Sequence, residues 1–198
     1  MYQQWQRWRA ARVFESIVHD LNELQRVLLG RAATPTAVVF DGRTLQSTPE
    51  SGHRAGYDGA KKRKGRKAHI AVDTLGHLLS VVITPANEQE RAQVGQRCQR
   101  VQEITGKPSR SALVTKAIRA KTPNTRQRCM TLICRSSPSP KGKPTLLVPR
   151  RWEVERSFAW CSRFRRLARD YERLSNSLQQ LHFVVFACIM LARYANSA

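Results

Sequence analysis

The sequence predicts a mixed α/β (α+β) domain, because helical and strand patterns alternate along its 198 residues. Residues 2–29 carry apolar side chains at helical spacings. Residues 36–45 contain the continuous apolar run of a buried strand, and residues 69–86 hold two β-rich runs around a turn signal. A chain of this length can bury one hydrophobic core.

The first predicted helix, over residues 2–29, ends at Gly30, a residue typical of helix C-termini. No capping residue precedes this helix, so we expect that an upstream region has been truncated. We therefore assign residues 1–30 to a remnant N-terminal helix and residues 31–198 to the main domain. The residues expected to face inward are Trp5, Trp8, Val13, Ile17, Leu21, Leu24 and Leu28.

The predicted strand over residues 36–45 has an apolar run that ends at Asp41 and Gly42. The following residues, 46–68, are rich in glycine and basic side chains, so we expect them to be largely exposed, with Asp58 as a flexible-loop acid. In the hairpin over residues 69–86, Asp73 is expected to be a turn residue.

The second half of the chain predicts three helices. A helix fits residues 87–104, and a second begins near Val154. The last, over residues 177–195, is apolar nearly all round and is expected to be buried. The middle helix carries one apolar stripe, made of Val154, Phe158, Cys161, Phe164, Ala168 and Tyr171.

The segment from residue 106 to residue 152 breaks this pattern. It contains no Asp or Glu, carries 12 Lys and Arg, and has little periodicity. Such a composition is typical of a basic, poorly ordered loop.

The net charge of +21 favours an anionic partner, above all nucleic acid. A membrane is the weaker choice, because the longest apolar run, residues 181–194, is too short to span. The five cysteines contain no Cys-x-x-Cys pair, which argues against a disulfide framework or a zinc site and favours the reducing cytoplasm.

Two acids are candidates for a metal site. Asp41 ends the predicted buried strand, and Glu155 begins a helix rich in arginine. Carboxylates from a sheet and from a helix packed on it are what Mg²⁺-dependent phosphodiester chemistry requires. On spacing alone the signal is weak, and turn-capping for Asp41 and a surface salt bridge for Glu155 are the simpler alternatives.

Three blocks in order, VVFDGRTLQST, GYDGAKKRKGRKAHIAVDTLGHLLSVVITPAN and RRWEVERSFAWCSRFRRLARDYERL, resemble bacterial insertion-sequence transposases of the DDE class, the four/five group. The resemblance implies a ribonuclease H-like mixed sheet flanked by helices. It also implies that Asp41 and Glu155 hold Mg²⁺ or Mn²⁺ as catalytic metal ligands. It further implies DNA strand cleavage and transfer, with transposon ends and target DNA as partners, in the bacterial cytoplasm at the nucleoid.

The basic residues of these blocks are the candidates for contact with the DNA backbone, which would position DNA without reading its sequence. A solvated helix face and a basic tether are the alternatives for the two clusters. The candidates are Lys61, Lys62, Arg63, Lys64, Arg66, Lys67, Arg151, Arg156, Arg163 and Arg166.

The family's second aspartate has no counterpart here. It belongs on a central strand in an Asp-x-Gly-Tyr motif, where this chain reads ALVTKAIRAKTP. The codons from Val114 onward can be chosen so that their shifted frame reads Asp-Gln-Gly-Tyr-Thr-Gly-Glu. We therefore hypothesise that residues ~109 to ~148 are a frameshifted insert that disrupts the central strand region.

Three functions remain open from the sequence. The first is a DDE transposase by descent, catalytically impaired because one of three carboxylates is missing. The second is a non-enzymatic DNA-binding remnant. The third is a poorly folded product, because unpatterned sequence replaces part of the central layer. A homo-oligomer is compatible with each of the first two.

Overall fold

The computed structural model describes residues 2–51, 54–88, 111–114 and 151–197. The predictions of a helix over residues 87–104 and of a loop over residues 106–152 therefore lie almost wholly outside the described residues. The described elements are α1 (Tyr2–Ala10), α2 (Val13–Leu28), β1 (Ala37–Gln46), β2 (Gly56–Asp58), β3 (Arg63–Val72), β4 (Leu78–Pro85), β5 (Ser111–Val114), α5 (Arg151–Ser162), α6 (Arg165–Ala168) and α7 (Ser175–Ser197).

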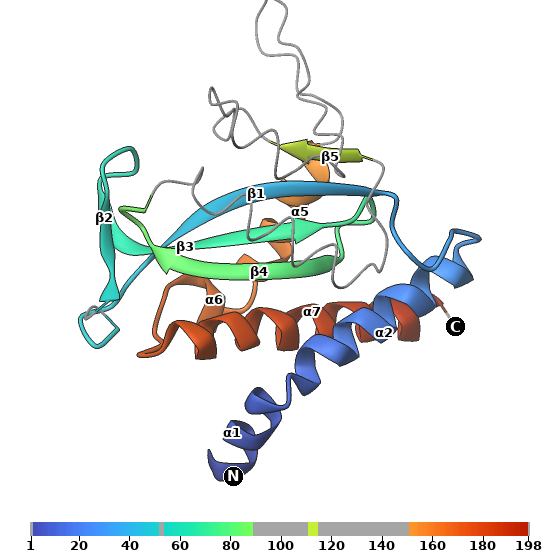
Figure 1. Cartoon of the computed structure of the whole chain (residues 1–198), viewed down its shortest axis with the longest axis horizontal. Coiled ribbons are helices and arrows are strands. Elements are labelled where there is room, and N and C mark those ends of the chain that lie inside the picture. Colours follow the sequence, from blue (N-terminus) through green and yellow to red (C-terminus); the bar gives the residue numbers. More distant parts are fainter. Residues whose placement is uncertain (1, 52–53, 89–110, 115–150, 198) are drawn as a thin grey trace, which may run out of the picture.

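The five strands form one mixed sheet. β3 lies at its centre and pairs antiparallel with β1 on one side and with β2 and β4 on the other. β5 pairs with the far side of β1 and runs parallel to it. The prediction of a mixed sheet flanked by helices, as in a ribonuclease H-like domain, is confirmed (Figure 1).

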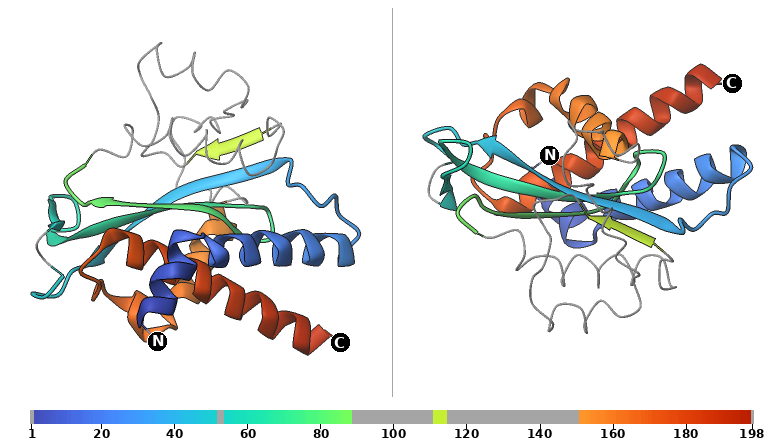
Figure 2. Two further views of the ribbon diagram at one scale, coloured as in Figure 1. Left: turned by 60° about the horizontal axis from the view of Figure 1, so that its bottom comes forward. Right: turned by 90° about the horizontal axis from the view of Figure 1, so that it is seen from above.

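The described helices gather on one face of this sheet (Figure 2). Side chains alternate between the two faces of a strand, so β1 directs Val39 and Leu45 to the helical side. There they join one core with residues of β3, β4, α2, α5, α6 and α7. Fully buried members of that core include Val18, Ile70, Val72, Leu78, Val154, Leu178, Phe183, Phe186 and Met190.

The N-terminal helix differs from the prediction in two ways. It is broken between α1 and α2, where Arg12 has a left-handed φ of 53°. It also packs by a different face: Val18 is fully buried, whereas Leu24 and Leu28 are 46% and 61% exposed. The stop at Gly30 is as predicted, with a positive φ of 67° and a hydrogen bond from its N–H to the Val27 carbonyl.

Two strand predictions need correction. β1 does not end at Asp41 and Gly42 but continues to Gln46, because β3 supplies partners along its length. Residues 46–68 are not largely exposed either. They contain β2 and half of β3, and Ser51, Asp58 and Arg66 are all buried.

The predicted turn between β3 and β4 is confirmed, and Asp73 is its organising residue. The Asp73 carboxylate accepts the N–H groups of Leu75 and His77, and pairs with Arg26 of α2 at 2.7 Å. Both side chains of this ion pair are buried. Asp73 therefore belongs to the turn, and it connects the turn to α2.

α5 and α7 are attached to the same turn. Ser157 of α5 donates its hydroxyl to the Gly76 carbonyl at 2.7 Å, and Arg156 donates to the Leu75 carbonyl at 2.9 Å. Arg193 of α7 contacts the His77 ring at 3.3 Å. Three helices therefore contact the same turn, through four of its residues.

The helix predicted from Val154 onward is shorter than its apolar stripe. α5 ends at Ser162, and the short α6 begins at Arg165 in a new direction. In consequence Leu167 is buried, whereas Ala168 is exposed and Tyr171 is 43% exposed.

α7 is long and apolar enough, by length and composition, to cross a membrane, which is weak evidence by itself. It is packed instead as a core helix: Phe183 and Phe186 are fully buried, and Gln25 of α2 donates to the Met190 carbonyl. It is not buried all round as predicted, because Leu191 and Tyr194 are about half exposed.

Candidate functional site

Asp41 lies in the middle of β1, opposite Ile70 of β3. By strand alternation its side chain points to the helical face, as do those of Val39 and Arg43. The carboxylate is half-buried, and its Oδ1 accepts the N–H of Gly42 at 2.9 Å. A mid-strand position excludes the alternative in which Asp41 is a turn cap.

Glu155 lies on the element that packs against this part of β1. The guanidinium of Arg43 donates to the carbonyl of Phe158 in α5 at 3.2 Å. Asp41 precedes Arg43 by two residues on the same face of the strand, and Glu155 precedes Phe158 by three residues, about 4.5 Å of helix. The two predicted metal ligands therefore lie on two elements that pack against each other through Arg43 and Phe158.

β5 runs beside β1, in the region where the resemblance implies a second aspartate. Val114 pairs with Phe40, so the strand that runs beside β1 reaches the residue directly before Asp41. Neither Val114 nor another residue of β5 carries a carboxylate. The next residue, Thr115, lies outside the described residues.

Asp41 and Glu155 have the oxygen ligands that Mg²⁺ prefers, but two carboxylates are few for a pair of ions. In the part of the chain that the structure describes, no three His, Cys, Asp or Glu side chains gather as a metal site. The described residues thus fit part of a two-metal centre.

The lysine run forms the tip of the hairpin between β2 and β3. Its four residues, Lys61 to Lys64, are all exposed, and Lys62 has a left-handed φ of 49°. Asp58 at the end of β2 is not a flexible-loop acid as predicted, because it is only 5% exposed. Its carboxylate accepts the N–H groups of Ala60 and Lys61 at 3.0 and 3.1 Å.

Two further groups fix Asp58. The hydroxyl of Thr44 in β1 donates to Oδ2 at 2.5 Å, and the ammonium of Lys67 lies 3.9 Å from the same oxygen. Burial by itself would raise the pKa of the Asp58 carboxyl. The hydrogen bond from Thr44, the two backbone N–H groups and the charge of Lys67 together outweigh burial, so this pKa lies below its usual range. Lys67, half-buried and turned toward Asp58, thus holds the base of the hairpin.

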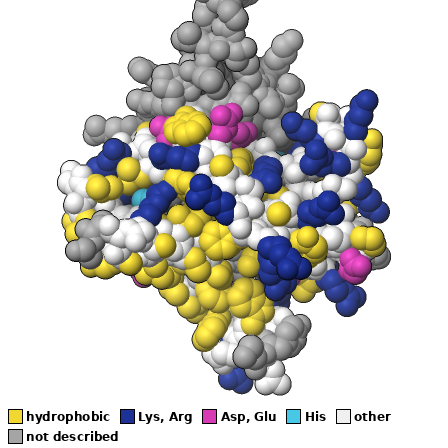
Figure 3. All heavy atoms as spheres, turned by 180° about the vertical axis from the view of Figure 1, so that it is seen from behind, with side chains coloured by type: hydrophobic (Ala, Val, Ile, Leu, Met, Phe, Trp, Pro, Cys, Tyr) yellow, Lys and Arg dark blue, Asp and Glu magenta, His cyan; other side chains and the backbone are white. Residues whose placement is uncertain are grey.

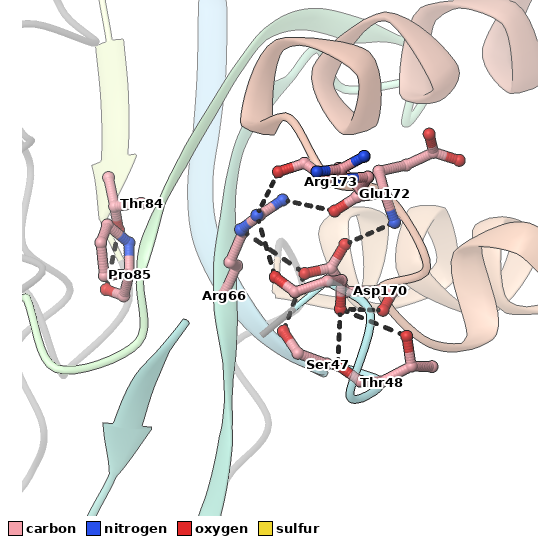
Figure 4. Close-up of polar contacts among 9 residues, drawn as sticks. Ser47, Thr48, Arg66, Thr84, Pro85, Asp170, Glu172 and Arg173 are labelled. Carbon is pink, nitrogen blue, oxygen red and sulfur yellow. Dashed lines mark hydrogen bonds and ion pairs between the residues drawn. The ribbon is translucent and has the colours of Figure 1, made fainter. Parts of the chain in front are cut away.

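Arg66 does not lie with the exposed lysines, so the prediction that it contacts DNA is wrong. Its side chain is 1% exposed and points toward Asp170 (Figure 4). Its guanidinium donates to the carbonyls of Ser51, Glu172 and Arg173 at 3.3, 3.0 and 2.9 Å. A guanidinium surrounded by backbone carbonyls cannot reach a phosphate.

The predicted arginines of the C-terminal block have different environments. Arg156 is half-buried beside the β3–β4 turn, with its guanidinium 4.9 Å from the Trp160 ring centroid. Arg163 is exposed, and so is Arg166, which forms an ion pair with Glu172. The side chain of Arg151 lies outside those that the structure describes.

Within the described part of the C-terminal block, three exposed arginines were not among the predicted contacts, namely Arg165, Arg169 and Arg173. They lie in and after α6, in the arginine-rich block itself, and the sequence signal that could have found them is this composition. Lys and Arg side chains spread across the upper part of the face shown in Figure 3, above a continuous apolar area.

The hairpin and the α6 arginines are connected. Arg66 lies at the base of the hairpin in β3 and bonds to the backbone of Glu172 and Arg173, the segment that follows α6. Within that segment, Glu172 is paired with Arg166, and Asp170 is buried. The exposed charged side chains of the β2–β3 hairpin and of the segment around α6 are therefore mainly positive.

Comparison with protein families gives two matches. A family model described as a transposase DDE domain matches residues 32–113. A second model of the same description matches residues 110–192. The two matches meet at β5 and together cover the sheet and the helices from α5 to α7 almost completely. No curated protein matches the chain.

Proposed function

We propose that this chain, which belongs to the DDE transposases, is an insertion-sequence transposase that binds DNA but has lost most or all of its catalytic activity. Transposon ends and target DNA are its proposed partners, in the bacterial cytoplasm at the nucleoid. The observation that carries the proposal is the combination of an exposed basic surface with a carboxylate pair that lacks its third member.

DNA binding is supported by the exposed cations of the hairpin tip and of the segment around α6. So much like charge on one surface repels itself unless phosphates neutralise it. Contacts of this kind hold the DNA backbone and do not read base sequence. Arg151, Arg163 and Arg166 stay in the proposed surface, whereas Arg66 is left out and Arg156 is assigned to the β3–β4 turn.

Loss of catalysis is supported by the register of β5. In intact relatives the acids hold Mg²⁺ or Mn²⁺, which activates the attacking oxygen and stabilises the leaving one. Here Asp41 and Glu155 would hold the metal. The strand beside β1 carries Val114 close to the place where the resemblance implies an aspartate. Two carboxylates bind a single ion weakly, so the rate of strand cleavage should collapse.

A shifted reading frame accounts for the missing acid. The aspartate that the shifted frame can encode is spelled across codons 114 and 115. Val114 pairs with Phe40, so the next position along β5 would adjoin Asp41. The pairing of Val114 thus supports the hypothesis that the shifted frame encodes the family's second aspartate.

A plasmid-nicking assay tests the catalytic part of the proposal. The chain is incubated with supercoiled DNA carrying its transposon ends, with Mg²⁺ or with Mn²⁺, beside the variants Asp41→Asn and Glu155→Gln. We expect the same background nicking from all three proteins. Nicking that needs metal and disappears in both variants would show that two carboxylates suffice.

The second candidate function is a DNA-binding remnant that occupies the DNA of an active relative. The same basic surface favours it, and it predicts binding without cleavage even after the frame has been repaired. A repaired chain that cuts DNA in the presence of Mg²⁺ would exclude this alternative. A circular-dichroism melting curve tests the third reading, a poorly folded product, and we expect a cooperative transition from the described core.

A further inference from the structure

The hairpin that carries the lysines also carries an exposed aromatic ring. Tyr57 is the central residue of β2, and its side chain is 59% exposed. Its partner across the hairpin is Lys64. Directly opposed residues of two antiparallel strands point to the same face, so the phenol ring and the Lys64 ammonium share one side of the hairpin.

The ring is held on a rigid support. Asp58, the next residue, is buried and receives hydrogen bonds from Thr44, Ala60 and Lys61. At the base of the hairpin, a Cβ on Gly65 would collide with the carbonyl of Leu45, so the hairpin lies directly against β1. These contacts hold the backbone of the hairpin on either side of Tyr57.

An exposed aromatic ring beside cations is the arrangement with which proteins bind unpaired nucleotides. A base of a duplex is stacked between its neighbours and offers no free face to a side chain, whereas an unpaired base can stack on a tyrosine. The cations next to the ring attract the phosphates on either side of that base. Phosphate binding alone would require the lysines but not the ring.

We infer that Tyr57 is a stacking site for an unpaired base at a single-stranded end or junction, and that Lys61, Lys62 and Lys64 hold the adjoining phosphates. Asp58 acts as a positioning residue that fixes the ring and the lysine-bearing turn. The inference rests on the proposed DNA binding and adds the class of DNA to it: duplex with unpaired nucleotides, in preference to blunt duplex.

The test uses the full chain and two DNA duplexes of equal length, one blunt and one with a short single-stranded overhang. The first unpaired base of the overhang is 2-aminopurine, whose fluorescence falls when it stacks. We expect Tyr57→Ala to weaken binding of the overhang DNA about 10-fold and to restore the fluorescence. Binding of blunt DNA should stay within about twofold.

Two variants serve as controls. Tyr57→Phe keeps the aromatic face and should bind overhang DNA like the unaltered chain. Tyr194→Ala removes a tyrosine of similar exposure, 46%, from the end of α7, and should change neither the affinity nor the fluorescence. Because Tyr57 is exposed, its replacement should leave the melting curve unchanged.

Failure of the inference can be distinguished from failure of the proposed function. The triple variant Lys61→Gln, Lys62→Gln, Lys64→Gln should weaken binding of both DNAs. If it weakens both while Tyr57→Ala affects them equally or not at all, the stacking site is refuted and the DNA-binding hairpin stands. If the triple variant leaves both affinities unchanged, both proposals are overturned.

Discussion

Arg66 and Asp170 meet as a buried ion pair, with 3.6 Å between Nε and Oδ2 and side-chain exposures of 1% and 0%. Ser47 also donates its hydroxyl to Asp170 Oδ2 at 2.8 Å, and the Asp170 N–H bonds to the Gln46 carbonyl (Figure 4). This contact joins the end of β1, the middle of β3 and the segment between α6 and α7. It thereby fixes the hairpin relative to the α6 arginines.

Replacing Asp170 by alanine should cost about 3–5 kcal/mol of the free energy of unfolding. The change leaves the Arg66 charge buried with no anion beside it, and it removes the acceptor of the Ser47 hydroxyl. Urea unfolding followed by circular dichroism measures the loss.

The matched control for this pair is Glu172→Gln. Glu172 pairs with Arg166, whose side chain is 67% exposed, and exposed ion pairs contribute at most about 1 kcal/mol. An equal loss in both variants would contradict the assignment of the Arg66–Asp170 pair as the buried one that matters.

The free energy of unfolding should fall as the pH is lowered from about 6.5 to about 4. Burial lowers the pKa of His77 and of His182 to about 4, from the usual 6.5. Below pH 6.5 the unfolded chain therefore binds protons that the folded chain does not, and each histidine contributes a loss of about 1.4 kcal/mol per pH unit.

Urea titrations at pH 7.5 and at pH 5.5 measure this effect. His77→Gln and His182→Gln should each remove about half of the difference in stability between the two pH values. Equal stability at both pH values would contradict this prediction. It would mean that His77 and His182 take up protons in the folded chain as easily as in the unfolded chain.

Substituting Gly76 by alanine should destabilise the fold by about 2 kcal/mol or more. Gly76 has a φ of 82°, and a Cβ there would lie 2.9 Å from Ser157 Oγ and 3.1 Å from Trp160 Cζ3. Backbone strain of this kind costs about 1–3 kcal/mol before any displacement of α5 is counted.

Alanine substitutions at two other glycines distinguish the cost of backbone strain from the cost of steric crowding. Gly30→Ala meets a positive φ of 67° in open space and should cost about 1 kcal/mol. Gly59→Ala meets open space without a positive φ and should change stability by less than about 0.5 kcal/mol. A Gly76→Ala loss no larger than that of Gly30→Ala would show that α5 does not press on the turn.

The salt dependence of DNA binding should report the lysines of the hairpin. Log affinity falls with log salt concentration, and each phosphate contact contributes about −0.9 to that slope. Lys61→Gln should therefore make the slope less steep by about 1. Arg31→Gln is the control, since Arg31 is exposed but bonds to Thr74 at the opposite end of β3. Equal slopes for Lys61→Gln and the unaltered chain would remove Lys61 from the interface.

The gene itself should preserve the lost acid. We expect the nucleotide sequence across codons 104 to 150, read from third bases, to encode Asp-Gln-Gly-Tyr at codon 114. Direct sequencing and translation in three forward frames checks this. A gene whose three frames all lack the motif would mean that the basic segment arose as it stands, and would favour DNA binding without DDE catalysis.

The sequence determined the elements whose signals are local. The apolar run of β1, the turn from Asp73 to Gly76 and the stop at Gly30 follow from hydrophobic pattern and from residues with special backbone freedom. The three motif blocks likewise predicted a transposase DDE domain, the description of both family models that match the chain.

Only the tertiary structure decided which face of α2 is buried and what each basic residue does. Val18 is buried and Leu24 is not because α7 and β4 both pack on one side of α2. Helical periodicity alone does not predict which side of a helix these elements cover. Arg66 and Lys64 belong to one basic run. Only Arg66 is buried, because β3 brings it within reach of Asp170, a residue that is distant in sequence.

The candidate site shows the same division. The sequence blocks predicted Asp41 and Glu155 as metal ligands. Only the structure shows that their elements, β1 and α5, pack against each other through Arg43 and Phe158. The resemblance implies a second aspartate that the sequence lacks near Val114, and only the structure shows that Val114 pairs with Phe40, next to Asp41. A residue's type is local information, whereas its partner is set by pairing and packing between segments far apart in the chain.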